Sequence, residues 1–113
     1  MNNIFNLSPL LEEFFIQISG IKYKLNLSIQ SIVLIENWNN EIGEEKLNDV
    51  SKLSEEEIKS CLRILIINDD SEKLLLKLEE FNKRQKNIIL EQTYILWCNK
   101  ALPIIEMQNI CLF

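Results

Sequence analysis

The chain has 113 residues, of which 47% are apolar, and this composition excludes wholesale disorder and predicts one domain with a sizeable core. Only two glycines and two prolines are present, which is untypical of turn-rich β-sandwiches and barrels and favours long helices. The formal net charge of −5 disfavours nucleic-acid binding, and no stretch reaches the roughly 20 apolar residues that span a bilayer.

The first predicted element is a β-hairpin over residues 13–27, in the stretch EFFIQISGIKYKLNL. A two-residue turn at Ser19-Gly20 would pair Ile18 with Ile21, and Gly20 supplies the positive φ that tight hairpin turns require. This register places the lysines on one face and the apolar side chains on the other. The apolar face would consist of Phe14, Ile16, Ile18, Ile21, Tyr23 and Leu25.

Helical spacing follows the hairpin, so we expect a mostly α, α+β domain with the hairpin packed on four or five helices. Ser28 and Gly43 are typical of the start and end of the first helix. Ser54 begins a capping box with Glu57, and residues 68–71 (NDDS) are predicted to break the chain and cap the next helix. The helices are expected at about residues 29–42, 55–67, 72–84 and 87–102, before an apolar tail over residues 104–113.

Residues 72–102 contain no glycine or proline and form either one long helix or two. Two helices with a bend near Gln85 are favoured, because the intervening NKRQKN is polar all round. Pro103 is expected to end the last helix or its first part. The apolar tail either packs on the domain or docks on a partner.

The residue types present argue against catalysis. Without histidine, the commonest general base and metal ligand are missing. The thiols of Cys61 and Cys98 have no base in view, and the stretch Asn68-Asp69-Asp70 fits helix capping better than a calcium loop. We therefore expect no enzyme, no catalytic residue, no metal and no cofactor.

Three further features concern the compartment and the surface. Three widely spaced cysteines without a CxxC pair predict free thiols in a reducing compartment. The first fifteen residues have no basic start and are interrupted by acids, unlike a secretory signal, so a cytoplasmic protein is expected. The short basic run over residues 83–86 is interpreted as a solvated helix face.

Large apolar residues are the candidates for contact with a partner protein. Trp38 and Trp97 are either core residues or interface anchors, where tryptophan is enriched. Phe15 falls on the polar face of the hairpin and is either exposed or covered. The full set of candidate partner-binding residues is Phe15, Trp38, Trp97, Ile110, Leu112 and Phe113.

Two stretches carry a family resemblance. The segment FFIQISGIKYKLNLSIQSIVLIENW resembles the hairpin and first helix of small tail assembly proteins of phages and prophages of Gram-positive bacteria. The segment LSEEEIKSCLRILI is similar to the acidic helix that follows in such families, and the resemblance covers about residues 8–80. It implies a non-enzymatic chaperone that holds a tape-measure or tail-tube protein during assembly. The last thirty residues match nothing in this pattern.

Two other functions fit the same residues. An immunity or inhibitor protein would use the acidity to bind a basic partner, and this binding would weaken with salt. A homo-oligomeric structural component would use its apolar tail between copies. No nucleic acid or membrane is expected as a partner.

Overall fold

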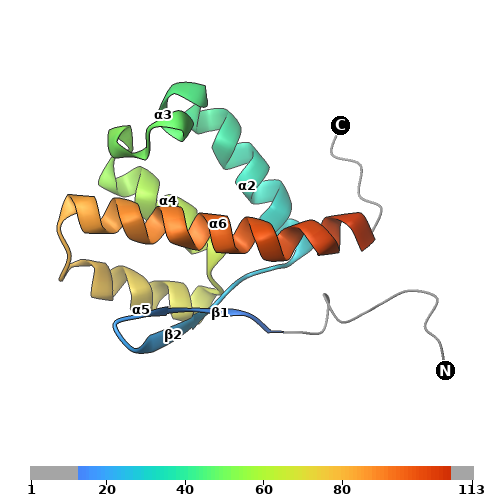
Figure 1. The fold of residues 1–113 in the computed structure, drawn as a ribbon, viewed down its shortest axis with the longest axis horizontal. Coiled ribbons are helices and arrows are strands. Elements are labelled where there is room, and N and C mark those ends of the chain that lie inside the picture. The colour runs from blue at the N-terminus through green and yellow to red at the C-terminus, as the bar shows by residue number, and fades with distance from the viewer. Residues whose placement is uncertain (1–12, 108–113) are drawn as a thin grey trace.

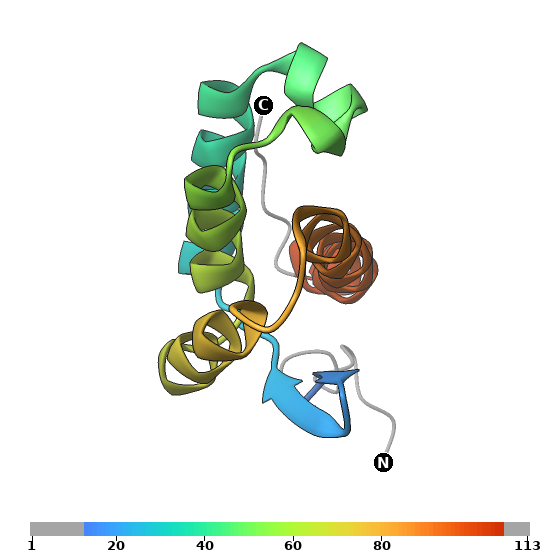
Figure 2. The same cartoon turned by 90° about the vertical axis from the view of Figure 1, so that its left-hand side faces the viewer.

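The computed structural model describes residues 13–107 and shows a two-stranded antiparallel hairpin followed by five α-helices and one 3-10 helix (Figure 1). The expected mostly helical α+β fold is thus confirmed. α2 and α4 form one layer, α6 lies opposite it, and the hairpin and α5 close the lower end (Figure 2). The elements are β1 (Phe15–Ile18), β2 (Ile21–Lys24), α2 (Ile29–Ile42), α3 (Glu44–Asn48), η1 (Val50–Lys52), α4 (Glu55–Leu65), α5 (Asn68–Leu78) and α6 (Lys83–Met107).

The hairpin has the predicted register. Ile18 pairs with Ile21 across the turn, and Ser19 and Gly20 both have positive φ (52° and 80°). The Leu25 backbone N–H donates to the Phe14 carbonyl at 2.8 Å, which extends the pairing beyond the strands. Most of the predicted apolar face is buried or half-buried, but Ile21 is exposed at the tip.

A third extended segment holds the hairpin to the helices. Leu25 forms an antiparallel bridge with Ile66, the residue that follows α4. Asn26 donates its backbone N–H to Leu65 (2.8 Å), and Ile67 donates to Lys24 (3.0 Å). Because a two-stranded hairpin is marginally stable alone, these long-range hydrogen bonds account for its place in the fold.

α2 has the predicted bounds because both of its ends are encoded locally. The Ser28 hydroxyl accepts the Ser31 backbone N–H at 3.1 Å, and Gly43 ends the helix with φ 85°. Between these caps, the side chains that face α4 recur at helical spacing and are buried. They are Ser31, Ile32, Ile35 and Trp38.

α4 is the central helix and packs against α2, α5 and α6. It begins with the predicted capping box, in which Ser54 and Glu57 exchange hydrogen bonds of 2.8 and 3.1 Å. Every side chain of its apolar stripe is fully buried. The stripe consists of Ile58, Cys61, Leu62 and Leu65.

Two predicted breaks between helices were in the wrong place, and the bounds of the last three predicted helices shift accordingly. Residues 68–71 do not form a break, because α5 begins at Asn68 and the chain turns at residues 66–67. The break before α6 lies at residues 79–82, not near Gln85. Gln85 belongs to the first turn of α6, where it exchanges two hydrogen bonds of 2.9 Å with Asn82.

α6 continues through Pro103 to Met107, so the first part of the predicted tail is helical. Its apolar residues do not all share one buried face, since Ile88, Ile95 and Leu102 are exposed. The side of α6 that faces the core also contains polar residues, so it could not be recognised in the sequence as an apolar stripe. It consists of Lys86, Asn87, Leu90, Thr93, Trp97 and Ala101.

Candidate protein-binding surface

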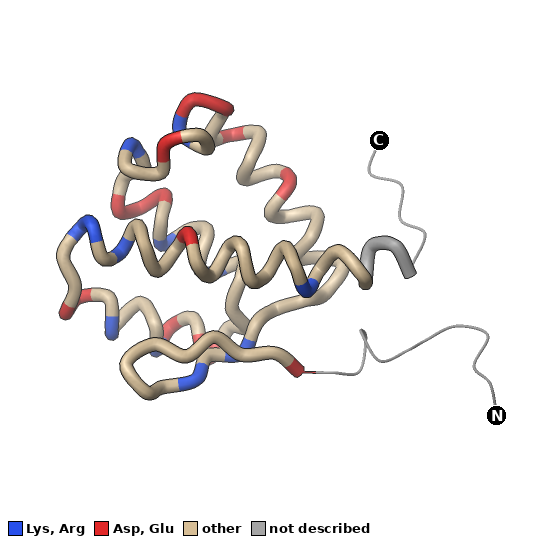
Figure 3. The backbone as a smooth tube through the Cα atoms, in the orientation of Figure 1, with Lys and Arg blue, Asp and Glu red and all other residues tan. Residues whose placement is uncertain are grey.

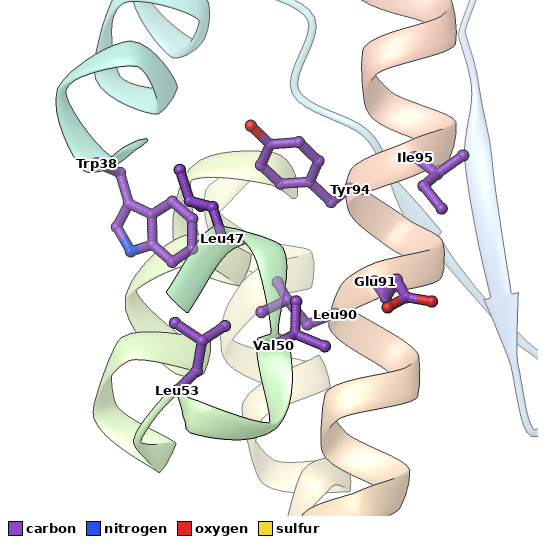
Figure 4. Close-up of a pocket in the computed structure, with 8 residues that line it drawn as sticks. All are labelled: Trp38, Leu47, Val50, Leu53, Leu90, Glu91, Tyr94 and Ile95. Atoms are coloured by element: carbon purple, nitrogen blue, oxygen red, sulfur yellow. The ribbon is translucent and has the colours of Figure 1, made fainter. Parts of the chain in front are cut away.

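An apolar cleft of about 350 Å³ opens between α2, the α3–η1 connection and α6 (Figure 4). Among its lining residues only Glu91 is charged. Cavities of this size lie at the lower end of the range for ligand sites and accommodate one large apolar group. The lining consists of Trp38, Leu47, Val50, Leu53, Leu90, Glu91, Tyr94 and Ile95.

The cleft exists because the chain reverses after α2. Gly43 adopts a φ of 85° and donates its N–H to the Asn39 carbonyl, which allows α3 to begin at the next residue. The Asp49 carboxylate then caps η1 by accepting the Ser51 N–H at 3.2 Å. These two turns place Leu47 beside Trp38, on the side of the cleft opposite α6 (Figure 4).

The two aromatic walls of the cleft are held in different ways. The Tyr94 hydroxyl donates to Asn39 Oδ1 at 2.9 Å, and burial raises the pKa of this phenol, so it stays protonated. The Trp38 ring lies 6.4 Å from the Tyr94 ring, at an interplanar angle of 44°. The buried Trp38 Nε1 has no hydrogen-bond partner among the side chains and backbone groups that the structure describes.

Exposed apolar side chains continue from the cleft along the outer side of α6. Ile88, Ile95 and Leu102 are spaced seven residues apart and are 51%, 49% and 54% exposed. Residues seven apart lie within about 20° of each other around a helix, so the three share one face. We call this face the α6 stripe. Ile95 belongs both to the stripe and to the wall of the cleft.

Other exposed apolar residues lie away from the cleft. Ile29, Val33 and Leu34 are exposed on α2. Ile21 at the hairpin tip and Leu76 on α5 line a shallow depression, together with Tyr23 and charged residues of α5. Neither group adjoins an enclosed apolar cavity in the part of the chain that the structure describes.

Ion pairs hold the elements around the cleft together. Lys46 of α3 contacts Glu57 of α4 at 2.9 Å, and the Ser54 N–H, followed by Lys46, lowers the pKa of the Glu57 carboxyl. Lys86 of α6 binds Glu55 and lowers the pKa of Glu55. Lys86 is buried, so the prediction of a wholly solvated basic face over residues 83–86 was wrong at this position.

The two cysteines among the described residues, Cys61 and Cys98, are free. Burial raises the pKa of the Cys61 and Cys98 thiols, which disfavours the nucleophilic thiolate. Among the side chains that the structure describes (residues 13–103), no group of three or more acidic or thiol side chains is placed to hold a metal ion. None of the helices in the described ranges is long and apolar enough to cross a membrane.

The structure separates the residues that were predicted to contact a partner. Phe15 is 44% exposed on β1, whereas Trp38 and Trp97 are 5% and 4% exposed and belong to the core. Trp38 still lines the cleft, but Trp97 does not, and its Nε1 donates to the Asn26 carbonyl at 2.6 Å. The remaining three candidates, Ile110, Leu112 and Phe113, lie outside the described residues.

Sequence reasoning missed the cleft residues Leu47, Val50, Tyr94 and Ile95 as candidates. The cleft is formed by segments that are far apart in the chain, so no local sequence pattern predicts it. The α6 stripe did have a signal, because the spacing of Ile88, Ile95 and Leu102 is visible in the sequence.

The comparisons with known proteins give no further identification. A scan of protein-family models, a search of curated proteins and a search of solved structures found no match to this chain.

Proposed function

We propose that this protein is a non-enzymatic protein-binding factor that serves as a tail assembly chaperone or accessory protein of a phage or prophage. The observation that supports binding is the apolar cleft beside the α6 stripe. The tail-assembly role is supported by the resemblance of residues 8–80 to that class of protein.

In this proposal the partner contributes an amphipathic helix. Such a helix would lie along the α6 stripe and insert one large apolar side chain beside Ile95 and Tyr94. Helix-in-groove recognition uses this combination of a stripe and a pocket. Full burial of one such side chain contributes about 1.5–3 kcal/mol, which suits a contact that must later be released.

The chaperone role combines the apolar α6 stripe with the acidic character of the chain. The stripe would cover apolar surface on an unassembled tail-tube or tape-measure protein in the cytoplasm of the bacterial host. The chain's net charge of −5 would keep the complex soluble through mutual repulsion.

Binding of the purified chain to the tail-tube and tape-measure proteins of the same source tests the proposal. Ile95→Lys should weaken binding at least tenfold, because it places a charge at the centre of the contact. Leu34→Lys is the matched control, since Leu34 is similarly exposed (43%) on α2, outside the cleft lining, and should leave affinity unchanged.

Three results would contradict the proposal. An equal loss of affinity in both variants would show that the partner does not bind at the α6 stripe. A dimer that Ile95→Lys dissociates would assign the stripe to self-association, as in a homo-oligomeric structural component. Selective binding to a basic toxin, abolished by salt, would instead indicate an immunity protein.

A further inference from the structure

The two edges of the hairpin differ in how their backbone groups are used. Antiparallel strands alternate between residues bonded to each other and residues whose N–H and C=O point outward. The hydrogen bond from Leu25 to Phe14 fixes this alternation. The outward groups of β1 therefore belong to Phe15 and Gln17, and those at the end of β2 belong to Lys24.

The β2 edge is occupied. Lys24 donates its backbone N–H to the Asp70 carboxylate at 2.7 Å and accepts the Ile67 N–H at 3.0 Å. α5 packs along the same side of the hairpin, so this edge offers no room for another strand (Figure 2).

The β1 edge has no such cover within residues 13–107. No described residue hydrogen-bonds the outward backbone groups of Phe15 or Gln17, and both side chains are exposed. Figure 2 shows no described helix or strand beyond β1, on the side opposite α5. A strand edge in this condition is a template for strand addition.

Three lysines, on β2 and α6, lie near the hairpin although the chain as a whole is acidic, and one acid, Glu13, directly precedes β1 (Figure 3). Lys100 of α6 lies over the Phe14 ring, with Nζ 4.6 Å from its centroid, and has no ion-pair partner among the described residues. Lys22 is likewise exposed and unpaired in that part of the chain, whereas Lys24 contacts Glu13 at 2.8 Å. Lys22 lies opposite Gln17 on the outer face of the hairpin, so a carboxylate on the outer face of an added strand would be attracted to it.

The inner face of the hairpin determines where an added strand would need apolar residues. Phe14, Ile16 and Ile18 are half-buried on the side of the hairpin that packs against the core. An added strand would continue this face with every second side chain. Apolar residues would therefore alternate with polar or acidic ones in a fitting segment.

We propose that the β1 edge binds an extended segment of a partner protein in which apolar and acidic residues alternate. The segment would pair with the backbone of Phe15 and Gln17 and bring a carboxylate to Lys22, which lies opposite Gln17 on the outer face of the hairpin. This site is separate from the cleft and the α6 stripe, so it adds a second mode of recognition to the proposed function.

Amide hydrogen exchange on the full chain, followed by NMR, tests the proposal. The probe is a blocked heptapeptide of alternating valine and glutamate, and its twin has lysine in place of glutamate. The glutamate peptide should slow exchange at the Phe15 and Gln17 amides, and the lysine peptide should bind at least fivefold more weakly.

A pair of variants isolates the backbone contact. Gln17→Pro removes one outward N–H without touching a bond between β1 and β2, and proline is tolerated at such edge positions. It should weaken peptide binding about fivefold, the effect of one hydrogen bond. Gln17→Ala keeps the N–H and should bind normally.

Other results would overturn the proposal. Phe15 and Gln17 amides that are already protected in the free chain at all concentrations would mean that the chain covers its own edge. Protection that rises with protein concentration would mean that a second copy occupies it. Equal affinity for both peptides, or no effect of either, would contradict the proposal that this edge binds an acidic segment.

Discussion

α4 and α6 both cross the centre of the molecule, but they use their apolar residues differently. α4 has one apolar stripe, and all of it is fully buried. α6 buries Leu90, Trp97 and Ala101 and also exposes three large aliphatic side chains on its opposite side. The residues of α4 are therefore explained by folding alone, whereas the outer side of α6 carries apolar surface that the described core does not use.

The largest test of this difference compares one aliphatic residue from each helix. Leu62→Ala in α4 should lower the free energy of unfolding by about 2–5 kcal/mol, because it leaves a cavity in a closed core. Ile95→Ala in the α6 stripe should change it by no more than about 0.5 kcal/mol. Urea denaturation followed by circular dichroism measures both. A large loss in Ile95→Ala would show that the α6 stripe is core in the full chain.

The next test concerns the inner side of α6. Trp97→Phe should lower stability by about 2 kcal/mol, because it loses ring area and the hydrogen bond from Nε1 to the Asn26 carbonyl. Trp38→Phe loses the same area, but the Trp38 Nε1 has no partner in the described residues, so it should cost roughly 1 kcal/mol less. Equal losses would show that the Trp97 hydrogen bond contributes nothing.

The caps of the two helices provide a smaller test. Ser54→Ala removes the hydroxyl that accepts the Glu57 N–H, and Asn82→Ala removes the oxygen that accepts the Gln85 N–H. Each substitution should cost about 1 kcal/mol by thermal denaturation. Ser60→Ala, on the exposed side of α4, should have little effect.

The smallest effect concerns acid sensitivity at the start of α4. The Ser54 N–H and Lys46 lower the pKa of Glu57 from its ordinary 4.5, so its ionised form stabilises the fold. This contribution is present above pH 4.5 and disappears as the pH falls through the lowered pKa. Glu57→Gln keeps a capping side chain without the charge, and its stability should fall less over this range. Parallel acid titrations of the two chains would contradict this assignment.

The elements predicted well from the sequence are those whose signals are local. The hairpin register follows from side-chain alternation and the turn at Ser19-Gly20. The bounds of α2 follow from Ser28 and Gly43, and the start of α4 follows from its capping box. In each case neighbouring residues satisfy the backbone hydrogen bonds.

The boundaries that were missed depend on distant residues or on a signal that was overlooked. Asn68 begins α5 rather than a loop, and Asp70 in its first turn accepts a hydrogen bond from Lys24, a partner 46 positions away. No local pattern contains that contact. The start of α6 was readable, since Asn82 and Gln85 have the spacing of a reciprocal cap.

The candidate surface was less predictable than the fold. α6 has apolar residues on both sides, so periodicity alone could not show that Leu90 faces inward and Ile95 outward. Its buried side also contains Thr93, whose hydroxyl is satisfied within the helix by the Ile89 carbonyl at 2.7 Å. Which side of such a helix is covered depends on the tertiary arrangement.

The bridge between Leu25 and Ile66 has a consequence for the order of folding. α4 and α5 can form through local contacts, but the hairpin gains its anchor only after a long loop has closed. It should therefore dock late during refolding and detach first in native-state fluctuations. A chain built in this way could expose its β1 edge more widely for short periods while its helical body remains intact.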